Sequence, residues 1–490
     1  MEKLQVLMEL HPCFYGFAGI PQETRLLFSY FLELPQVHAT GLLSADVPTV
    51  SFRTTRQNPH QTVNHLSQFI IATLDPVGMS FMEKGKVAIN LFRTSVKNML
   101  GLSIPMAYFH AKGFEDFLWE QLFSKTLNVD EFERITSALF RCISFSRHTL
   151  YMMKCRSLFP KIATRGYDVL FVQTPFPGRV DRKTQLVIRY HDAVPLFVPH
   201  LIDNPKPHQA SHYQALCANA KTGIFICTSE AVRHDLLYTF PTLETRSEVI
   251  HDSISPHYFE ESTTMRHLTE IIRQYADSSR RAMGGSEDSE EAFYQSHLSD
   301  PNLRYVMMVS TIEPRKNQIR LIRAWELACR QLKRPVKLIL VGDLGWQVEP
   351  ILTAMRPWQR RGDLFHLQKV PIESLRLLYQ GAACVVCPSV KEGFDLSGIE
   401  AMACGGKVVA SDIPVHREIY GQGALYFDPY SAEKQADTIA SLLVPNNERA
   451  PLLREQGLLQ AKRYQKKTIQ PQWDHFFEQL RLSRAMSGAF

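Results

Sequence analysis

The sequence predicts an α/β protein of two domains, each a doubly wound, Rossmann-like parallel sheet. The chain of 490 residues is longer than one ordinary domain of about 100–200 residues. Its composition, 45% hydrophobic and 21% charged, is typical of a globular protein. Short β-rich runs alternate with amphipathic helical patterns, which indicates parallel strands with helices on both faces of each sheet.

The second half of the chain shows this alternation most clearly. Helical patterns at residues 318–332 and 374–381 lie between runs that are apolar throughout, as expected for strands buried on both faces. The expected strands are residues 305–310, 336–342, 384–388, 408–411 and 425–427. We therefore assign residues 301–470 to a second domain.

The first half repeats the pattern over residues 1–255, with one long interruption. The expected strands are residues 4–10, 169–173, 186–190, 224–228 and 249–251. The interval 45–164 is mostly helical in pattern, and we interpret it as an insertion that forms a cap on this domain. Residues 256–300 are assigned to a linker or mobile loop, because the stretch from 276 onward is polar and has few apolar residues.

The last segment, residues 471–490, is assigned to a C-terminal helix. Phe476, Phe477 and Leu480 fall on one face of its helical pattern. We expect that face to pack back on the first domain.

Charge and targeting signals narrow the classes of function. The excess of 55 Lys and Arg over 49 Asp and Glu is mild, and it suits an anionic substrate or contact with an anionic membrane surface. No zinc-finger or RNA-recognition spacing is present, so nucleic acid is not an expected partner. We expect no signal peptide and no membrane-spanning helix, and hence a cytoplasmic protein with at most a peripheral position on the inner membrane face.

The nine cysteines give no metal or redox signal. Cys384 and Cys387 form a CxxC pair inside a predicted strand, where positions three apart point to opposite faces. No second pair completes a zinc site. We expect buried, reduced thiols and no bound metal.

The strongest chemical signal is the segment 392–406, which follows the predicted strand 384–388. Ligands of open α/β sheets bind at the carboxyl ends of strands, and the helix that begins near Ser397 offers free N–H groups suited to a phosphate. Glu392 and Glu400 could accept hydrogen bonds from sugar hydroxyls. Ser397 and Glu400 also match a capping box, so a purely structural role for Glu400 stays open.

A second signal is the segment 309–317, in which a strand, a turn, a basic pair and a helix follow in that order. Arg315 and Lys316 could neutralise a diphosphate and stabilise it as a leaving group. Alone, the pair could equally be exposed bases at a helix start.

Together these segments resemble one enzyme family. Two glutamates with seven residues between them, ending in Glu-Ala-Met-Ala-Cys-Gly, are similar to the E-x7-E signature of retaining GT-B glycosyltransferases of the GT4 family. That family includes mannosyl- and glycosyltransferases of bacterial polysaccharide synthesis. The resemblance covers about residues 304–430. The chain departs from the family pattern at Thr311, where arginine is common, and at Ser397 and Lys407, where proline is common.

The resemblance implies a GT-B fold, with two domains facing a cleft, and a role for each matching residue. It implies that Glu400 binds the nucleotide ribose and that Glu392 binds hydroxyls of the donor sugar. It also implies that His191, near the end of the strand-like run 187–192, lies close to the donor sugar. Taken alone, His191 could equally be a structural histidine of the core. The implied catalytic residues are His191, Glu392 and Lys316. The implied donor-binding residues are Gly19, Arg315, Lys316, Gly342, Gly393, Phe394, Asp395, Leu396, Ser397 and Glu400.

The resemblance further implies a metal-independent transfer of a hexose with retention, and the sequence contains no D-x-D triplet. No cofactor is expected beyond the nucleotide-sugar donor. The residues Glu-Pro-Arg-Lys-Asn at positions 313–317 resemble those of mannosyltransferases, which favours GDP-mannose over a UDP-hexose as donor. The acceptor is expected to be a saccharide, a glycolipid or a protein. Two alternatives stay open: another GT-B enzyme, such as an epimerase or phosphorylase, and a catalytically silent binding protein.

Overall fold

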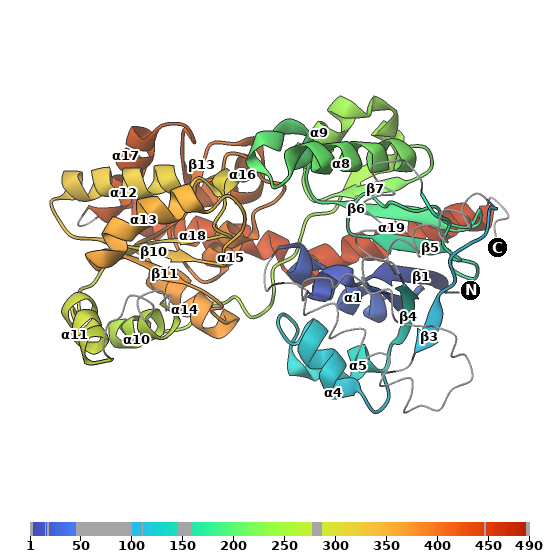
Figure 1. Ribbon diagram of the computed structural model, residues 1–490, viewed down its shortest axis with the longest axis horizontal. Coiled ribbons are helices and arrows are strands. Elements are labelled where there is room, and N and C mark those ends of the chain that lie inside the picture. The colour runs from blue at the N-terminus through green and yellow to red at the C-terminus, as the bar shows by residue number, and fades with distance from the viewer. Residues whose placement is uncertain are drawn as a thin grey trace, which may run out of the picture.

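The computed structural model describes residues 3–14, 16, 19–45, 100–109, 111–144, 159–276, 287–444 and 447–486. These residues form two α/β domains joined side by side (Figure 1). The first contains an eight-stranded sheet in the order β3-β4-β2-β1-β5-β6-β7-β8, and the second a six-stranded sheet in the order β11-β10-β9-β12-β13-β14. The GT-B architecture implied by the family resemblance is confirmed.

The N-terminal sheet is parallel except for β3, which pairs antiparallel with β4. Its strands are β1 (Leu4–Glu9), β2 (Val37–Ala45), β3 (Ala107–Phe109), β4 (Leu139–Ser144), β5 (Val169–Val172), β6 (Gln185–Tyr190), β7 (Ile224–Cys227) and β8 (Ser247–Val249). The helices of this domain are α1 (Ile20–Glu33), α4 (Glu115–Leu118), α5 (Phe132–Thr136), α7 (Val194–Phe197), α8 (Pro205–Asn219) and α9 (Glu230–Thr239).

The C-terminal sheet is parallel throughout. Its strands are β9 (Tyr305–Val309), β10 (Lys337–Val341), β11 (Leu364–Leu367), β12 (Cys384–Cys387), β13 (Val408–Ser411) and β14 (Ala424–Phe427). Its helices are α10 (Met265–Tyr275), α11 (Glu287–Leu298), α12 (Gln318–Leu332), α13 (Glu349–Arg360), α14 (Ile372–Gly381), α15 (Leu396–Ala403), α16 (Pro414–Tyr420), α17 (Ala432–Leu443) and α18 (Arg449–Ala461).

Alternate residues of the β9 strand pack into different cores, because side chains of a strand point to opposite faces. Tyr305 and Met307 lie in a core with α14 and α15, whereas Val306 and Met308 lie in a core with α12 and α17. Both faces of the sheet are therefore covered by helices, which explains why its strands read as continuous apolar runs.

The interval 45–164 is less separate than the sequence suggests. Within it, β4 pairs in parallel with β2, from Thr40 opposite Leu139 to Ala45 opposite Ser144, so the chain returns to the main sheet. The described part of the interval therefore contributes strands as well as the short helices α4 and α5. The expectation of helices at residues 46–99 lies outside the described residues.

The interval 256–300 is not the linker that its polarity suggested. It contains α10 and α11, and Leu268, Ile271 and Ile272 of α10 are buried in the C-terminal core. These three apolar residues at spacings i, i+3 and i+4 form one helical face, a signal that the surrounding charged residues obscured. Residues 277–286 lie outside the described part of the chain.

The C-terminal helix α19 (Lys466–Met486) extends from the C-terminal domain along the N-terminal domain (Figure 1). Trp473 is fully buried, and its ring packs edge-to-face on Phe31 at 5.4 Å and on Phe171 at 5.5 Å between centroids. The last helix thus completes the core of the first domain. No helix among the described residues combines the length and the apolar character needed to cross a membrane.

Candidate active site between the two domains

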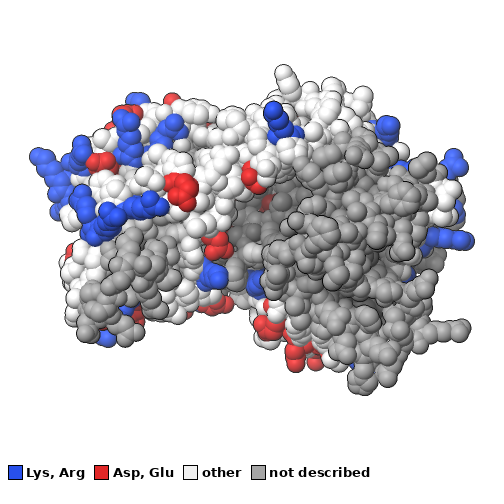
Figure 2. Space-filling model, in the orientation of Figure 1, with Lys and Arg blue, Asp and Glu red and all other residues white. Residues whose placement is uncertain are grey.

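A cavity of about 400 Å³ lies between the two domains, and the space-filling view shows a hollow there (Figure 2). Its walls come from residues that follow β1, β6 and β8 on one side, and β9, β10 and β12 on the other. All twelve residues singled out in the sequence line this one cavity: Gly19, His191, Arg315, Lys316, Gly342, Glu392, Gly393, Phe394, Asp395, Leu396, Ser397 and Glu400.

A larger depression of about 630 Å³ lies on the surface of the C-terminal domain beside α12. Its cations, Arg320 and Arg323, stand near Tyr430 and Glu433. None of the E-x7-E residues borders it, so the interdomain cavity is the candidate site.

The basic pair and the first glutamate of the motif form one ionic cluster. The Lys316 Nζ atom lies 2.6 Å from Oε1 of Glu392, and the Arg315 Nη1 atom lies 2.5 Å from its Oε2. Burial alone would raise the pKa of Glu392, but the two cations hold that pKa below its ordinary value. The exposed-base alternative is therefore wrong for this pair, since both side chains are largely buried.

Arg315 also donates from Nη2 to Glu313 Oε1 at 2.8 Å. Two carboxylates thus pair with the two cations. A phosphate in the cavity would share these cations with Glu392, whose negative charge opposes a second anion.

Glu400 contacts both domains. Gln22 of α1 donates from Nε2 to Glu400 Oε1 at 2.9 Å, and the Tyr379 hydroxyl donates to Oε2 at 3.3 Å. Burial raises the pKa of Glu400 to about 7, while these hydrogen bonds oppose the rise. The capping-box alternative is not realised, because α15 begins at Leu396 and Ser397 lies inside the helix.

The loop before α15 is held in an unusual conformation. Asp395 has φ +65°, in the left-handed region, and its Oδ2 atom lies 3.1 Å from His416 Nε2. The Tyr420 hydroxyl donates to the Asp395 carbonyl at 2.8 Å, and Ser397 donates to Asp395 Oδ1 at 2.7 Å. Burial would raise the pKa of Asp395, but the His416 hydrogen bond and Lys316 keep it below its ordinary range.

Two glycines of the predicted site are required by close backbone approach. A Cβ atom at Gly393 would lie 1.9 Å from the His191 carbonyl oxygen, across the domain boundary. At Gly342, which has φ +143°, a Cβ atom would lie 2.1 Å from the Ser310 carbonyl oxygen. Glycine at 393 therefore lets the two domains close on each other.

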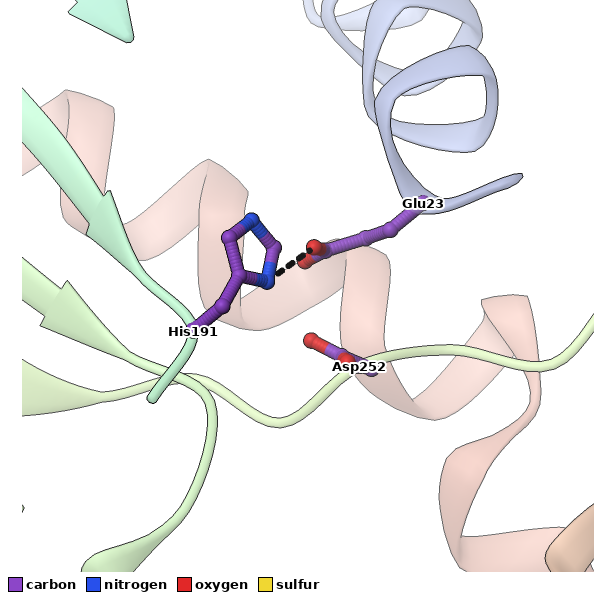
Figure 3. Close-up of side chains that lie close together, drawn as sticks. All are labelled: Glu23, His191 and Asp252. Atoms are coloured by element: carbon purple, nitrogen blue, oxygen red, sulfur yellow. Dashed lines mark ion pairs between the residues drawn. The ribbon is translucent and has the colours of Figure 1, made fainter. Parts of the chain in front are cut away.

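His191 sits in a buried polar cluster at the end of β6 (Figure 3). Its Nδ1 atom lies 3.2 Å from Glu23 Oε2, and its Nε2 atom lies 3.1 Å from Gln173 Oε1. Burial, with a contribution from Arg189, lowers the pKa of His191 well below its ordinary value. The imidazole is therefore neutral at physiological pH.

Glu23, His191 and Asp252 bring potential ligand atoms within 4.8 Å of one another, as in a metal site (Figure 3). However, Arg189 donates from Nε to Glu23 Oε1 at 2.6 Å and from Nη2 to Asp252 Oδ1 at 2.5 Å. The guanidinium already supplies the positive charge that these carboxylates need, and it would repel a second cation. This set does not fit a metal ion.

The sequence reasoning missed the residues that support the site, among them Gln22, Glu23, Gln173, Arg189 and Asp252. The sequence does allow a buried ion pair to be predicted at Arg189, because a charged residue inside the apolar run of β6 requires a buried partner. The partners themselves come from distant segments and carry no local pattern.

The domains are also joined beside the cavity. The Glu418 carboxylate of α16 accepts from the backbone N–H groups of Glu230 and Ala231, at 2.7 and 2.9 Å, at the start of α9. Its Oε1 atom lies 2.9 Å from His251 Nε2. Because a helix N-terminus favours an anion, this carboxylate holds the domains together at the site.

Residues 289–455 match the family model described as glycosyl transferases group 1. O-antigen chain mannosyltransferase B of Escherichia coli is 34% identical over 160 residues, which are 33% of this chain and 42% of that protein. The O-antigen chain mannosyltransferase RfbU of Salmonella typhimurium is 26% identical over 216 residues, 39% of this chain and 59% of that protein. The chain thus matches less than two thirds of the length of these relatives.

Solved structures match over nearly the whole chain at low identity. Sucrose-phosphate synthase from Thermosynechococcus elongatus has a TM-score of 0.56 and 15% identity, covering 98% of this chain and 100% of that one. HepE of Anabaena, in complex with UDP-glucose, has a TM-score of 0.54 and 14% identity, covering 97% and 100%. At this identity the match concerns the fold. Residues 289–455 of this two-domain GT-B chain therefore resemble the group 1 glycosyl transferases, and the chain is similar to O-antigen mannosyltransferases over part of their length.

Proposed function

We propose that the protein transfers a hexose, with mannose favoured, from a nucleotide-sugar to a saccharide, glycolipid or protein acceptor. The observation that carries this proposal is the buried cluster of Arg315, Lys316 and Glu392 beside the start of α15, inside the interdomain cavity. Two cations and a helix N-terminus at one place suit a diphosphate, and the cavity receives walls from both domains.

The charge of the leaving diphosphate would be stabilised by this chain's own groups. Arg315 and Lys316 donate charge-assisted hydrogen bonds, and the free N–H groups at the start of α15 add a partial positive charge. These groups take the part that a divalent cation plays in other transferases, which supports a metal-independent reaction.

In this proposal the acceptor attacks the anomeric carbon from the same face of the sugar from which the diphosphate leaves. The configuration at the anomeric carbon is therefore retained. In this mechanism no side chain attacks the sugar, and the leaving phosphate oxygen takes the acceptor proton. Glu392 would release Arg315 and Lys316 to the diphosphate and accept hydrogen bonds from hydroxyls of the donor sugar. Glu400 would bind the ribose. No cofactor beyond the donor is required.

The relatives support mannose as the transferred sugar. Several proteins that match 29–39% of this chain are mannosyltransferases of O-antigen chains or serotype-specific mannosyltransferases. GDP-mannose is therefore favoured over UDP-hexoses as donor, with a polysaccharide or its lipid-linked precursor as acceptor.

The proposal is tested by incubating the protein with GDP- and UDP-sugars, with and without saccharide acceptors, and detecting nucleotide release and acceptor mass. We expect turnover of GDP-mannose, unaffected by EDTA, with strong loss in Lys316→Ala and Glu400→Ala. Lys467→Ala, at an exposed position of α19, is the matched control and should keep wild-type activity. Turnover that EDTA abolishes, or nucleotide release without a modified acceptor, would contradict the proposed reaction.

A further inference from the structure

The cluster around His191 has an unbalanced charge if every group takes its usual form. Arg189 is fully buried and contributes one positive charge, whereas Glu23 and Asp252 are 1% and 5% exposed and would contribute two negative charges. An unpaired charge in such a site is costly, because little water reaches it. Adding one proton to the cluster restores neutrality.

The geometry indicates which atom carries that proton. Arg189 donates to Glu23 Oε1 and to Asp252 Oδ1, so both of these oxygens act as acceptors. Glu23 Oε2 is buried and makes no hydrogen bond as an acceptor, yet it lies 3.2 Å from His191 Nδ1. A proton on Oε2 turns this contact into a hydrogen bond from a carboxylic acid to an imidazole nitrogen.

Asp252, whose carboxyl lies within hydrogen-bonding reach of Glu23, is one other position for the proton, but Asp252 borders the cavity, where its charged form is better solvated than that of Glu23. The remaining position for the proton is His191. A protonated imidazole would stand beside the Arg189 guanidinium in a buried site, and both burial and Arg189 disfavour it. Burial also raises the pKa of Glu23 well above its ordinary value, with Asp252 adding to the rise and Arg189 opposing it. The neutral acid is thus the form that fits its surroundings.

We infer that Glu23 is a neutral acid that donates to His191 Nδ1, fixes the imidazole as the uncharged tautomer with its proton on Nε2, and so acts as a positioning residue for sugar transfer. The role of Glu23 in catalysis rests on the proposed function, whereas the tautomer of His191 does not. The Nε2 proton is then directed to Gln173 Oε1, so the ring is held at both nitrogens on the wall of the cavity.

The consequence for catalysis is electrostatic. The anomeric carbon becomes positively charged as its bond to the diphosphate breaks, so a positively charged histidine on the same wall would oppose the reaction. A neutral His191, held by a neutral Glu23, keeps this wall polar without adding positive charge.

The inference predicts a specific pH dependence. The ionisable groups facing Glu23 are Arg189 and His191 from β6 and its end, Asp252 after β8, and Tyr30 of the same helix. As pH rises and Glu23 loses its proton, Nδ1 loses its donor and the tautomer is no longer fixed. Wild-type kcat should therefore fall on the alkaline side as Glu23 ionises.

Two variants of similar size separate the neutral-acid role from simple packing. In Glu23→Gln the amide can still accept from Arg189 and donate to Nδ1, so we expect kcat within about threefold of wild type and no alkaline fall from this group. In Glu23→Met the hydrogen bond is lost, and we expect kcat to fall by about tenfold or more with a smaller change in the donor KM. Thermal melting of both variants checks that they fold.

Two kinetic results would contradict the inference. A Gln variant as impaired as the Met variant at every pH would mean that an ionised Glu23 is required. A folded Met variant with wild-type kcat would mean that Glu23 has no positioning role.

A second measurement does not depend on turnover. Protein labelled with ¹⁵N-histidine, with His191→Gln to assign the signal, should show His191 as the Nε2–H tautomer at neutral pH in wild type and in Glu23→Gln. An Nδ1–H or doubly protonated ring would overturn the inference even if every donor in the panel is inert. Absence of turnover with the expected tautomer would contradict only the proposed function.

Discussion

Glu392 pairs with the two cations that the proposed function assigns to the donor diphosphate, at 2.6 Å from Lys316 and 2.5 Å from Arg315. The carboxylate therefore has two opposed effects. It holds and neutralises the two cations, and in the proposed reaction it would compete with the donor phosphates for them.

Replacing Glu392 should separate these effects. In Glu392→Gln we expect nucleoside diphosphate to bind about tenfold more tightly, because a neutral amide competes less for the cations, while kcat falls. Titration calorimetry with GDP and UDP measures the first effect and donor turnover the second. Glu433→Gln, at an exposed position, is the control, and weaker binding in Glu392→Gln would show that the carboxylate mainly positions the cations.

Glu400 should make stability depend on pH. Its pKa rises from 4.5 unfolded to about 7 folded, so its contribution is fully present below pH 4.5 and is lost as pH rises through about 7. This shift corresponds to on the order of 3 kcal/mol. Between pH 5 and 8, we expect the melting temperature of ligand-free Glu400→Gln to decrease less than that of wild type. Glu455→Gln, on the exposed face of α18, is the control and should behave as wild type.

The residues found from the sequence share one property, which is that they lie within short motifs. Arg315 with Lys316, and Glu392 with Glu400, could be located because each motif places its members on one loop and one helix start. Gln22 meets Glu400 across 378 positions, and Arg189 meets Glu23 across 166, so only the folded chain defines these pairs.

At the scale of elements, buried strands that are apolar throughout were predictable to within one or two residues. The strands β2, β3, β4 and β11 were not expected. In β2, His38, Thr40 and Gly41 interrupt the apolar run, and in β11 His366 interrupts a run of only four residues, so neither gives a clear pattern. These strands are specified by pairing with neighbours already in the sheet.

The helix α19 contributes to the N-terminal core through Trp473, which contacts Phe31 and Phe171. Trp473→Ala should lower stability by about 3–5 kcal/mol, because it removes a large buried ring and leaves a cavity. Urea unfolding followed by circular dichroism measures the change. Leu482→Ala on the exposed side of the same helix should change stability by about 0.5 kcal/mol or less. Equal effects of the two substitutions would show that α19 does not complete the core.

At the scale of the whole molecule, the described structure is closed. Glu418 binds the start of α9 across the domain boundary, and Gln22 reaches Glu400 across the cavity. These contacts join the domains on both sides of the cavity, so loosening them would widen the cavity and admit more water.

Weakening this closure should affect binding more than the bond-breaking step. In Glu418→Ala we expect a larger radius of gyration by small-angle X-ray scattering and a donor KM several-fold higher, with a smaller change in kcat. Adding nucleotide should restore part of the compactness. An unchanged radius and KM would show that the other interdomain contacts suffice.

The return of α19 to the first domain affects how the protein is made. Phe31 and Phe171 are translated early, but Trp473, which covers them, follows β8 by roughly 220 residues. At 5–20 residues per second, the ribosome needs roughly 10–45 s to supply it. During that interval the emerging N-terminal domain exposes an aromatic surface, and a chaperone that binds nascent chains would find its target there.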